Sequence, residues 1–132
     1  MGVLTNEMKP ALQGVMPALV FTCSLDGIPN AAVISQVYRV DDDHVALSFQ
    51  FFNKTIRNIR ENPFAYAEVI DPNHGWLWRF ELQFLRSETS GPVFEEMEIQ
   101  LEAIASASGM TGIFHLKAAD IYKVHSAGRI PA

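Results

Sequence analysis

The residues with the clearest chemical potential are Asn53, Lys54 and Thr55, which place a capping amide, a cation and a hydroxyl side by side. Asparagine is a favoured N-cap, so this turn predicts the start of a helix. Free N–H groups at a helix start and the positive end of its dipole attract anions. Two interpretations stay open from local features: an anion cradle that uses Lys54 and Thr55, or a capped helix with exposed cations that binds nothing.

A strand and a helix must hold this turn in place. Residues 45–51 alternate between apolar side chains and a second set that includes Ser48 and Gln50, which is typical of a strand. Residues 53–62 carry two isoleucines three positions apart, and Pro63 ends the helix because it restricts the residue before it. The expected unit is a strand, a polar turn and a short amphipathic helix.

The remaining elements predict a small antiparallel β-barrel, closed or partly closed, with helices inserted between strands. Asp26-Gly27 indicates a tight turn between the first two strands, and a bend is expected around residues 118–120. The chain from 127 to 132 is expected to be a frayed tail. The predicted strands are 15–24, 30–40, 45–51, 65–70, 76–87 and 113–126, and the further helices are 6–13 and 92–107.

The fifth predicted strand has a marked period of two. Arg79, Glu81 and Gln83 lie on one of its sides, and the other side is a continuous apolar row that needs a barrel interior or a partner subunit to cover it. That row consists of Trp76, Trp78, Phe80, Leu82 and Phe84. The two tryptophans are first a core or interface feature, although a flat ligand could stack on one ring.

The composition fits one domain, residues 1–132, with 48% hydrophobic and 19% charged residues. A net charge of −5 argues against nucleic acid as a partner, so an anion would need the local cations Lys54, Arg57 and Arg60. The single cysteine, Cys23, allows no intrachain disulfide and favours a reducing compartment. Without a signal-like or membrane-spanning apolar run, the expected location is the cytoplasm, with no membrane partner.

Other catalytic and metal patterns are weak. Asp41, Asp42 and Asp43 are interpreted as a solvated turn, since no calcium-loop spacing follows them. The four histidines show no metal-ligand spacing, so no metal site is predicted. Neither a hydrolytic constellation nor a GxGxxG motif is present.

Three segments in this order resemble the pyridoxamine 5′-phosphate oxidase-like family of FMN-binding split barrels. They are DGIPNAAVISQVYRV, VALSFQFFNKTIRNIRENPFAYAEVIDP and HLKAADIYKV, and the resemblance covers roughly residues 8–125. It implies a mainly β, Greek-key split barrel of about six strands with two or three short helices. It also implies a homodimer with the flavin in a groove between the subunits.

The resemblance assigns the flavin phosphate to Lys54 and Thr55, where family members often carry an Arg-Lys pair, with Asn53 as the cap. It further implies that the second strand lines the isoalloxazine ring, and that the third strand reaches the ribityl chain or the ring edge. The partner subunit would complete the site through Trp76, Trp78 or Arg79. The second-strand residues are Ala32, Val33, Ile34 and Ser35, and the third-strand residues are Ser48 and Gln50.

The implied function is an FMN-dependent oxidoreductase that acts on an unidentified small molecule by hydride transfer at flavin N5. The C-terminal sequence VHSAGRIPA lacks the Arg- and His-containing substrate motif of the oxidases proper, so vitamin B6 chemistry is not expected. Two alternatives stay open: a non-catalytic flavin- or haem-binding module, and a reductase that uses the deazaflavin F420.

Overall fold

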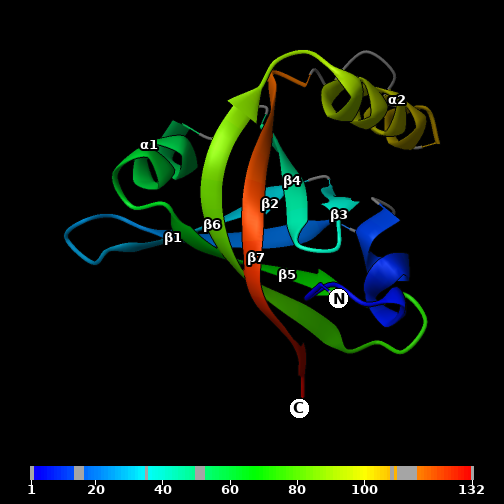
Figure 1. The fold of residues 1–132 in the computed structure, drawn as a ribbon, viewed down its shortest axis with the longest axis horizontal. Helices are drawn as coiled ribbons and strands as arrows, with labels where there is room; N and C mark the ends of the chain where they lie inside the picture. Colours follow the sequence, from blue (N-terminus) through cyan, green and yellow to red (C-terminus); the bar gives the residue numbers. More distant parts are fainter. Residues whose placement is uncertain are drawn as a thin grey trace.

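The computed structural model describes residues 2–13, 17–34, 36–49, 53–107, 109 and 116–131. Within them, seven antiparallel strands form one sheet in the order β2-β1-β5-β6-β7-β4-β3, with three helices around it (Figure 1). The mainly β, antiparallel barrel architecture is confirmed, with seven described strands rather than about six. The strands are β1 (Ala18–Cys23), β2 (Pro29–Ile34), β3 (Val37–Asp41), β4 (His44–Phe49), β5 (Phe64–Ile70), β6 (Leu77–Glu88) and β7 (Ala118–Ile130). The helices are η1 (Asn6–Gln13), α1 (Asn53–Glu61) and α2 (Pro92–Ala107).

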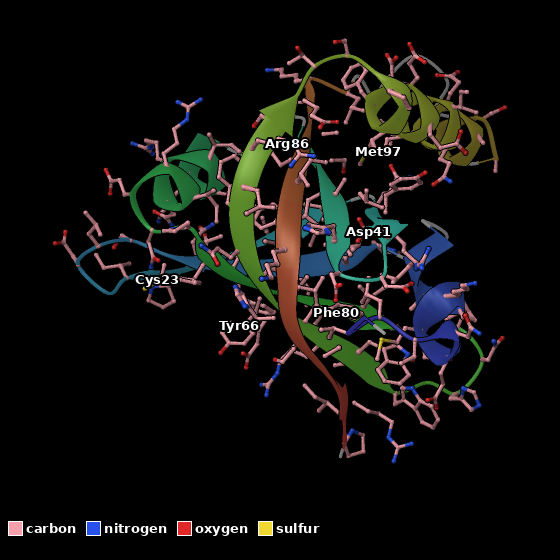
Figure 2. All side chains as sticks on the ribbon, in the orientation of Figure 1. Cys23, Asp41, Tyr66, Phe80, Arg86 and Met97 are labelled. Carbon is pink, nitrogen blue, oxygen red and sulfur yellow. The ribbon has the colours of Figure 1, made fainter. Side chains whose placement is uncertain are left out.

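The apolar row of β6 fills the interior of the barrel. Trp78, Phe80 and Leu82 are only 4%, 0% and 1% exposed, and Trp76 and Phe84 pack against the same core. Phe80 is labelled in Figure 2. Burying side chains of this size stabilises the fold by roughly 1.5–3 kcal/mol each. The chain's own interior therefore covers this row, and it does not call for a partner subunit.

Helix α2 covers the opposite, outer face of β3, β4 and β7. Its residue Met97, labelled in Figure 2, is fully buried. Met97 packs in one cluster with Ala46, Ala119 and Ile121. The period of 3.6 that predicted a helix over residues 92–107 is thus confirmed by its apolar stripe. No helix in the described part of the chain has the length and apolar character needed to cross a membrane.

The strand predicted over residues 30–40 is divided into β2 and β3, which lie at opposite ends of the sheet order. Ile34 and Val37 are three positions apart, yet both are buried in the interior cluster. An uninterrupted strand would place them on opposite faces. The break between them lets the chain cross from β1 to β4 while both residues stay in the core.

The prediction for the last strand was wrong at its C-terminal end. Residues 127–130 are not a frayed tail: they belong to β7 and pair with β6, for example Ile130 with Leu77 and Arg129 with Trp78. Residues 113–115, predicted as its start, lie outside the described residues.

The bend expected around residues 118–120 was also wrong, because those residues pair regularly with β4. The register instead shifts at Leu85 in β6 and at His125 in β7, each of which is skipped in the pairing. Such bulges increase the local twist, as two strands of 12 and 13 residues require when they curve around a barrel.

The first hairpin and its turn follow the prediction. Gly27 adopts φ 84°, which favours glycine, and its N–H donates to the Ser24 carbonyl at 3.0 Å. This tight turn places β1 and β2 in register, with Thr22 opposite Asn30. The hairpin is the platform on which α1 rests.

Candidate flavin-phosphate site

Helix α1 begins at Asn53, the residue predicted as its cap, whose side chain is outside the described set. The helix packs on the β1–β2 hairpin, on the left of the molecule in Figure 1. Its sheet-facing side combines one apolar residue, Ile59, which is 2% exposed, with the buried polar residues Thr55 and Asn58. The second predicted isoleucine, Ile56, is only half-buried. Hydrogen bonds as well as apolar packing must therefore hold this helix in place.

Three side-chain hydrogen bonds tie α1 and the residue after it to the hairpin. Asn30 Nδ2 donates to Thr55 Oγ1 at 3.1 Å, and Asn58 Nδ2 donates to Thr22 Oγ1 at 3.2 Å. Beyond the helix end, Asn62 Nδ2 donates to the Cys23 carbonyl at 3.3 Å. Each buried polar group thereby gains a partner, which offsets its loss of water.

The outward side of α1 is cationic. Lys54, Arg57 and Arg60 are all exposed. Among the described residues, the ion pairs involve other side chains and leave the Lys54 ammonium free of a carboxylate. The start of α1 therefore brings together a helix N-terminus, an available ammonium and the hydroxyl of Thr55, a residue that is 6% exposed.

Two buried polar groups near the start of β3 and the end of β4 lack partners within the described residues. Ser48 is 1% exposed with no partner for Oγ, and Gln36 is fully buried with none for Oε1. Gln36 Nε2 does donate to Gln100 Oε1 of α2 at 2.6 Å. An orphaned buried hydroxyl is costly, so Ser48 has capacity for a hydrogen bond that the described protein atoms do not supply.

A buried carboxylate lies at the same end of the sheet. Asp120 pairs with Leu47 of β4, is 3% exposed, and accepts one hydrogen bond, from Ser87 Oγ at 2.6 Å. Burial raises the pKa of Asp120, and the Ser87 hydrogen bond and the charge of Arg60 only partly oppose that rise.

The other predicted flavin contacts are spread over different surroundings. On β2, Ala32 is half-buried, Val33 is 64% exposed on the outer face, and Ile34 is 3% exposed in the interior. Ser35 and Gln50 lie outside the described residues. The structure brings Thr55 to β2 through Asn30, whereas Ser48 lies on the face that α2 covers.

Trp78 lies at the other end of the barrel. Its indole Nε1 donates to Asp71 Oδ2 at 2.9 Å, and its ring is 4% exposed. Trp76 stacks on His74 with ring centroids 4.1 Å apart, and the Arg129 guanidinium lies 4.5 Å from the Trp76 ring centroid. A flavin contact through Trp78 stays a prediction.

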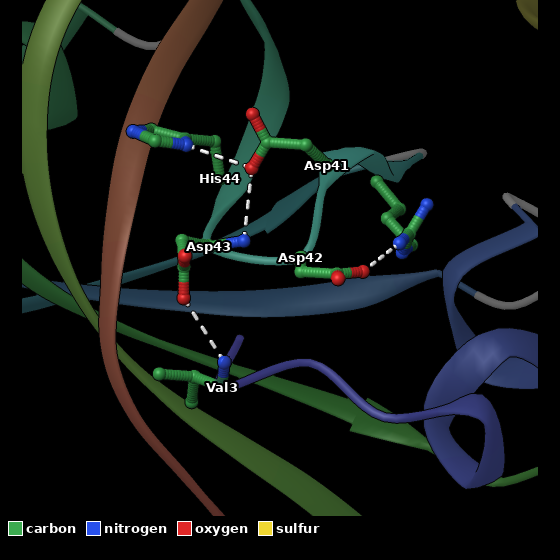
Figure 3. Close-up of polar contacts among 6 residues, drawn as sticks. Val3, Asp41, Asp42, Asp43 and His44 are labelled. Atoms are coloured by element: carbon green, nitrogen blue, oxygen red, sulfur yellow. Dashed lines mark hydrogen bonds and ion pairs between the residues drawn. The ribbon is translucent and has the colours of Figure 1, made fainter. Parts of the chain in front are cut away.

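The aspartate-rich turn is occupied by internal contacts (Figure 3). Asp41 Oδ1 accepts from the Asp43 N–H at 2.8 Å and contacts His44 Nδ1 at 2.8 Å, and Asp42 pairs with Arg39. Asp43 Oδ1 accepts from the Val3 N–H at 3.0 Å, which ties the N-terminal segment to the turn. Across the described residues, no group of three acidic, histidine or cysteine side chains is arranged to hold a metal ion.

Sequence reasoning missed Asn30, Thr22, Asn58, Gln36 and Asp120. A signal existed for the helix: Thr55, Asn58 and Asn62 recur at helical spacing on the side that also carries Ile59. The cross-strand pairing of Thr22 with Asn30 depends on the register of the hairpin, which the Asp26-Gly27 turn implies. The contacts of Gln36 and Asp120 join segments that are distant in sequence, and no local pattern predicts them.

Proteins of known structure share this fold. An FMN-binding protein from Syntrophomonas wolfei aligns with a TM-score of 0.75 over 93% of this chain and 85% of its own, at 17% identity. An F420 reductase aligns with a TM-score of 0.67 over 96% and 98%, at 13% identity. HutZ, the haem storage protein of Vibrio cholerae, gives a TM-score of 0.62 over 97% and 94%, at 13% identity. At these identities the likeness shows the fold alone, which is that of the split-barrel proteins.

The sequence comparisons cover less of the chain than the structural ones. No protein-family model matches the chain. A segment of 62 residues is 37% identical to the uncharacterized protein MJ0282 of Methanocaldococcus jannaschii, and it spans 46% of this chain and 41% of that protein. The match therefore covers less than half the length of this relative.

Proposed function

We propose that this protein binds FMN with its phosphate at the start of α1 and acts as an FMN-dependent oxidoreductase on a small molecule. The observation that carries the proposal is the pairing of the exposed Lys54 ammonium with the buried, hydrogen-bonded Thr55 hydroxyl at a helix N-terminus. An FMN-binding protein and an F420 reductase that share the fold provide the context.

The residues at this turn suit a phosphate monoester. Lys54 offers a compact positive charge without a fixed carboxylate partner, Thr55 offers a hydroxyl, and the first N–H groups of α1 point along the dipole. Charge-assisted hydrogen bonds of this kind are about twice as strong as neutral ones. In a chain with a net charge of −5, a local cation of this kind gives an anion its place to bind.

A bound flavin would supply hydride transfer through its N5 atom. The protein's part is to hold and orient the ring: β2 would offer backbone and side chains from Ala32 to Ile34, and β4 would offer Ser48. Ser35 and Gln50, which the resemblance also assigns to the flavin, lie outside the described residues. The unpartnered hydroxyl of Ser48 is available as one such hydrogen-bonding group. Hydride transfer at N5 does not itself require a general base from the protein.

The proposal includes a homodimer. With the β6 row covered by the barrel interior, the surface that suits a second copy is the outer face of β2, β1 and β5. It exposes Val33 (64%), Leu19 (38%), Phe64 (57%) and Tyr66 (43%) on neighbouring strands. Light scattering should report the mass of two chains, and a monomer at micromolar concentration would contradict the shared groove.

Haem and F420 are the competing cofactors. Each described histidine has one ring nitrogen engaged: His44 with Asp41, His74 with Asp71, and His125 with Gln83. None of the three lies on α1 or on the hairpin that holds it. The described histidines therefore do not favour axial haem ligation at this site over FMN.

The visible spectrum of the purified protein after reconstitution tests the proposal. FMN should give bound-flavin absorbance and quenched flavin fluorescence, and excess F420 should not displace it. Displacement by F420 would move the proposal to the deazaflavin, and a Soret band with haem but no FMN binding would overturn it. Turnover by the FMN form is then assayed by reduction of the flavin under anaerobic conditions with nicotinamide donors.

A further inference from the structure

Two hydrogen bonds, one helical turn apart, join α1 to the β1–β2 hairpin. Thr22 and Asn30 are directly opposite each other in the hairpin, and Thr55 and Asn58 are three apart on α1. Asn30 donates to Thr55 at 3.1 Å, and Asn58 donates to Thr22 at 3.2 Å. The bonds are alike in length, but they run in opposite directions between hairpin and helix.

The direction of each bond decides what it leaves available. A threonine hydroxyl has one proton to donate and two positions that accept. Because the Asn30 amide occupies an accepting position on Thr55 Oγ1, the Thr55 proton is left to donate elsewhere. Thr55 lies in the first turn of α1, beside Lys54 and the first backbone N–H groups of the helix.

We propose that Asn30 is a positioning residue that orients the Thr55 hydroxyl as a donor to the phosphate of the bound flavin. This inference rests on the proposed FMN site and adds a residue that the sequence did not identify. The phosphate is an anionic acceptor, so a donor that is already accepting from an amide is polarised toward it. Ser48, on the strand that precedes this turn, is 1% exposed, and its hydroxyl has no partner among the described residues.

The Asn58–Thr22 bond provides the matched control. Both of its side chains are buried, 6% and 4% exposed, and the donor belongs to the helix. This bond fixes α1 on the hairpin, but it orients no hydroxyl proton toward the start of α1. Loss of this bond should reduce stability without a selective effect on phosphate.

The experiment compares the dissociation constants of FMN and riboflavin, which share the ring and ribityl chain and differ only in the phosphate. In the wild-type protein, FMN should bind more tightly than riboflavin. Asn30→Ala should raise the FMN dissociation constant about five- to tenfold, the effect of one charge-assisted hydrogen bond, and leave that of riboflavin within about twofold. Thr22→Val should lower the melting temperature and leave the ratio of the two constants unchanged.

A double-mutant cycle with Thr55→Val tests whether Asn30 acts through Thr55. In the Thr55→Val background, Asn30→Ala should have no further effect on FMN binding. If Asn30→Ala reduces folding, Asn30→Asp serves instead: the carboxylate would accept the Thr55 proton, so the bond survives but FMN affinity falls while riboflavin affinity holds.

Equal losses for FMN and riboflavin, or an Asn30 effect that persists without the Thr55 hydroxyl, would overturn the positioning role while the FMN site stands. FMN binding that neither Asn30 variant alters would do the same. A wild-type protein that does not prefer FMN over riboflavin would instead remove the phosphate site, and this inference with it.

Discussion

Asp71 and Asp120 are both buried carboxylates, 1% and 3% exposed, but their surroundings differ. Asp71, in the loop between β5 and β6, accepts hydrogen bonds from the Asn73 and His74 N–H groups at 2.8 and 2.9 Å and from the Trp78 indole at 2.9 Å. Asp120, at the start of β7, accepts one, from Ser87. In Figure 1 the Asp71 loop and α1 lie on opposite sides of the molecule.

Asp71 is a structural carboxylate with several hydrogen-bond donors, whereas Asp120 lies in a polar region with few donors. Burial acts to raise the pKa of Asp71, but the hydrogen bonds from Trp78, Asn73 and His74 outweigh it and hold the pKa below its usual range. The pKa of Asp120 is raised because burial dominates there. Ser48 Oγ and Gln36 Oε1, which have no hydrogen-bond partner among the described residues, lie near the Asp120 end of β4 and β3. A third unpartnered buried atom among the described residues, Trp76 Nε1, lies beside the Asp71 loop, so unpartnered polar atoms occur at both ends of the barrel.

The two shifts give opposite dependences of stability on pH. Asp71 contributes stability that is present above its unfolded pKa of about 4 and is lost as the pH falls through its lower folded pKa. Asp120 binds its proton more tightly in the folded state, so its contribution to stability grows as the pH falls through its folded pKa toward about 4.

The largest effect is expected from a substitution that removes a hydrogen bond to Asp71. Trp78→Phe keeps an aromatic ring in the interior but removes the donor to Asp71. The free energy of unfolding should fall by about 2 kcal/mol, the range for a hydrogen bond to a charged group, as measured by urea denaturation. Acid unfolding should also begin at higher pH, because the Asp71 pKa loses its main lowering contact. A variant as stable as wild type would show that the indole bond contributes little.

A smaller effect, on FMN affinity, is expected from substitutions at the proposed phosphate site. Lys54→Ala removes an exposed ammonium at the helix start, and FMN should bind about tenfold more weakly, a loss of about 1.4 kcal/mol. Arg57→Ala removes a cation of the same charge two positions beyond Thr55, and we expect a change in FMN affinity below about threefold. Fluorescence titration of both variants measures the difference, and equal losses would mean that only the general field of α1 matters.

The smallest effect is expected at Asp120. Asp120→Asn keeps an acceptor for the Ser87 hydroxyl and removes a buried charge, so stability at pH 7 should be unchanged or rise by up to about 1 kcal/mol. The variant should also lose the rise in stability that Asp120 contributes as the pH falls. Melting curves between pH 4 and 8 test this, and a strongly destabilised variant would show instead that the carboxylate is a required structural group.

Local patterns were enough for much of the fold. The period of two in β6, the helical stripe of α2 and the Asp26-Gly27 turn all describe interactions between residues close in sequence, and the structure confirms them. The division of residues 30–40 was not predictable from local pattern, because it depends on β2 and β3 lying at opposite ends of the sheet. The extension of β7 to Ile130 likewise depends on pairing with the start of β6.

The candidate site was predictable only in its centre. Lys54 and Thr55 stand in one turn, so sequence alone identified them, and they remain the proposed phosphate ligands. Asn30 contacts Thr55 across 25 positions of sequence, and only the hairpin register brings it there. The period of two in residues 76–84 correctly predicted that Trp78 lies on an apolar face. That face lies in the interior of the barrel, where the Trp78 indole donates a hydrogen bond to Asp71.

The most direct test of the central claim is a chemical-shift map of the ¹⁵N-labelled protein with FMN and, separately, with riboflavin. The difference between the two maps reports the phosphate. We expect the largest differences at the backbone amides of Lys54 and Thr55 in the first turn of α1. Differences that cluster instead around the loop of Asp71, His74 and Trp76 would contradict the account, because they would place the phosphate at the opposite side of the barrel.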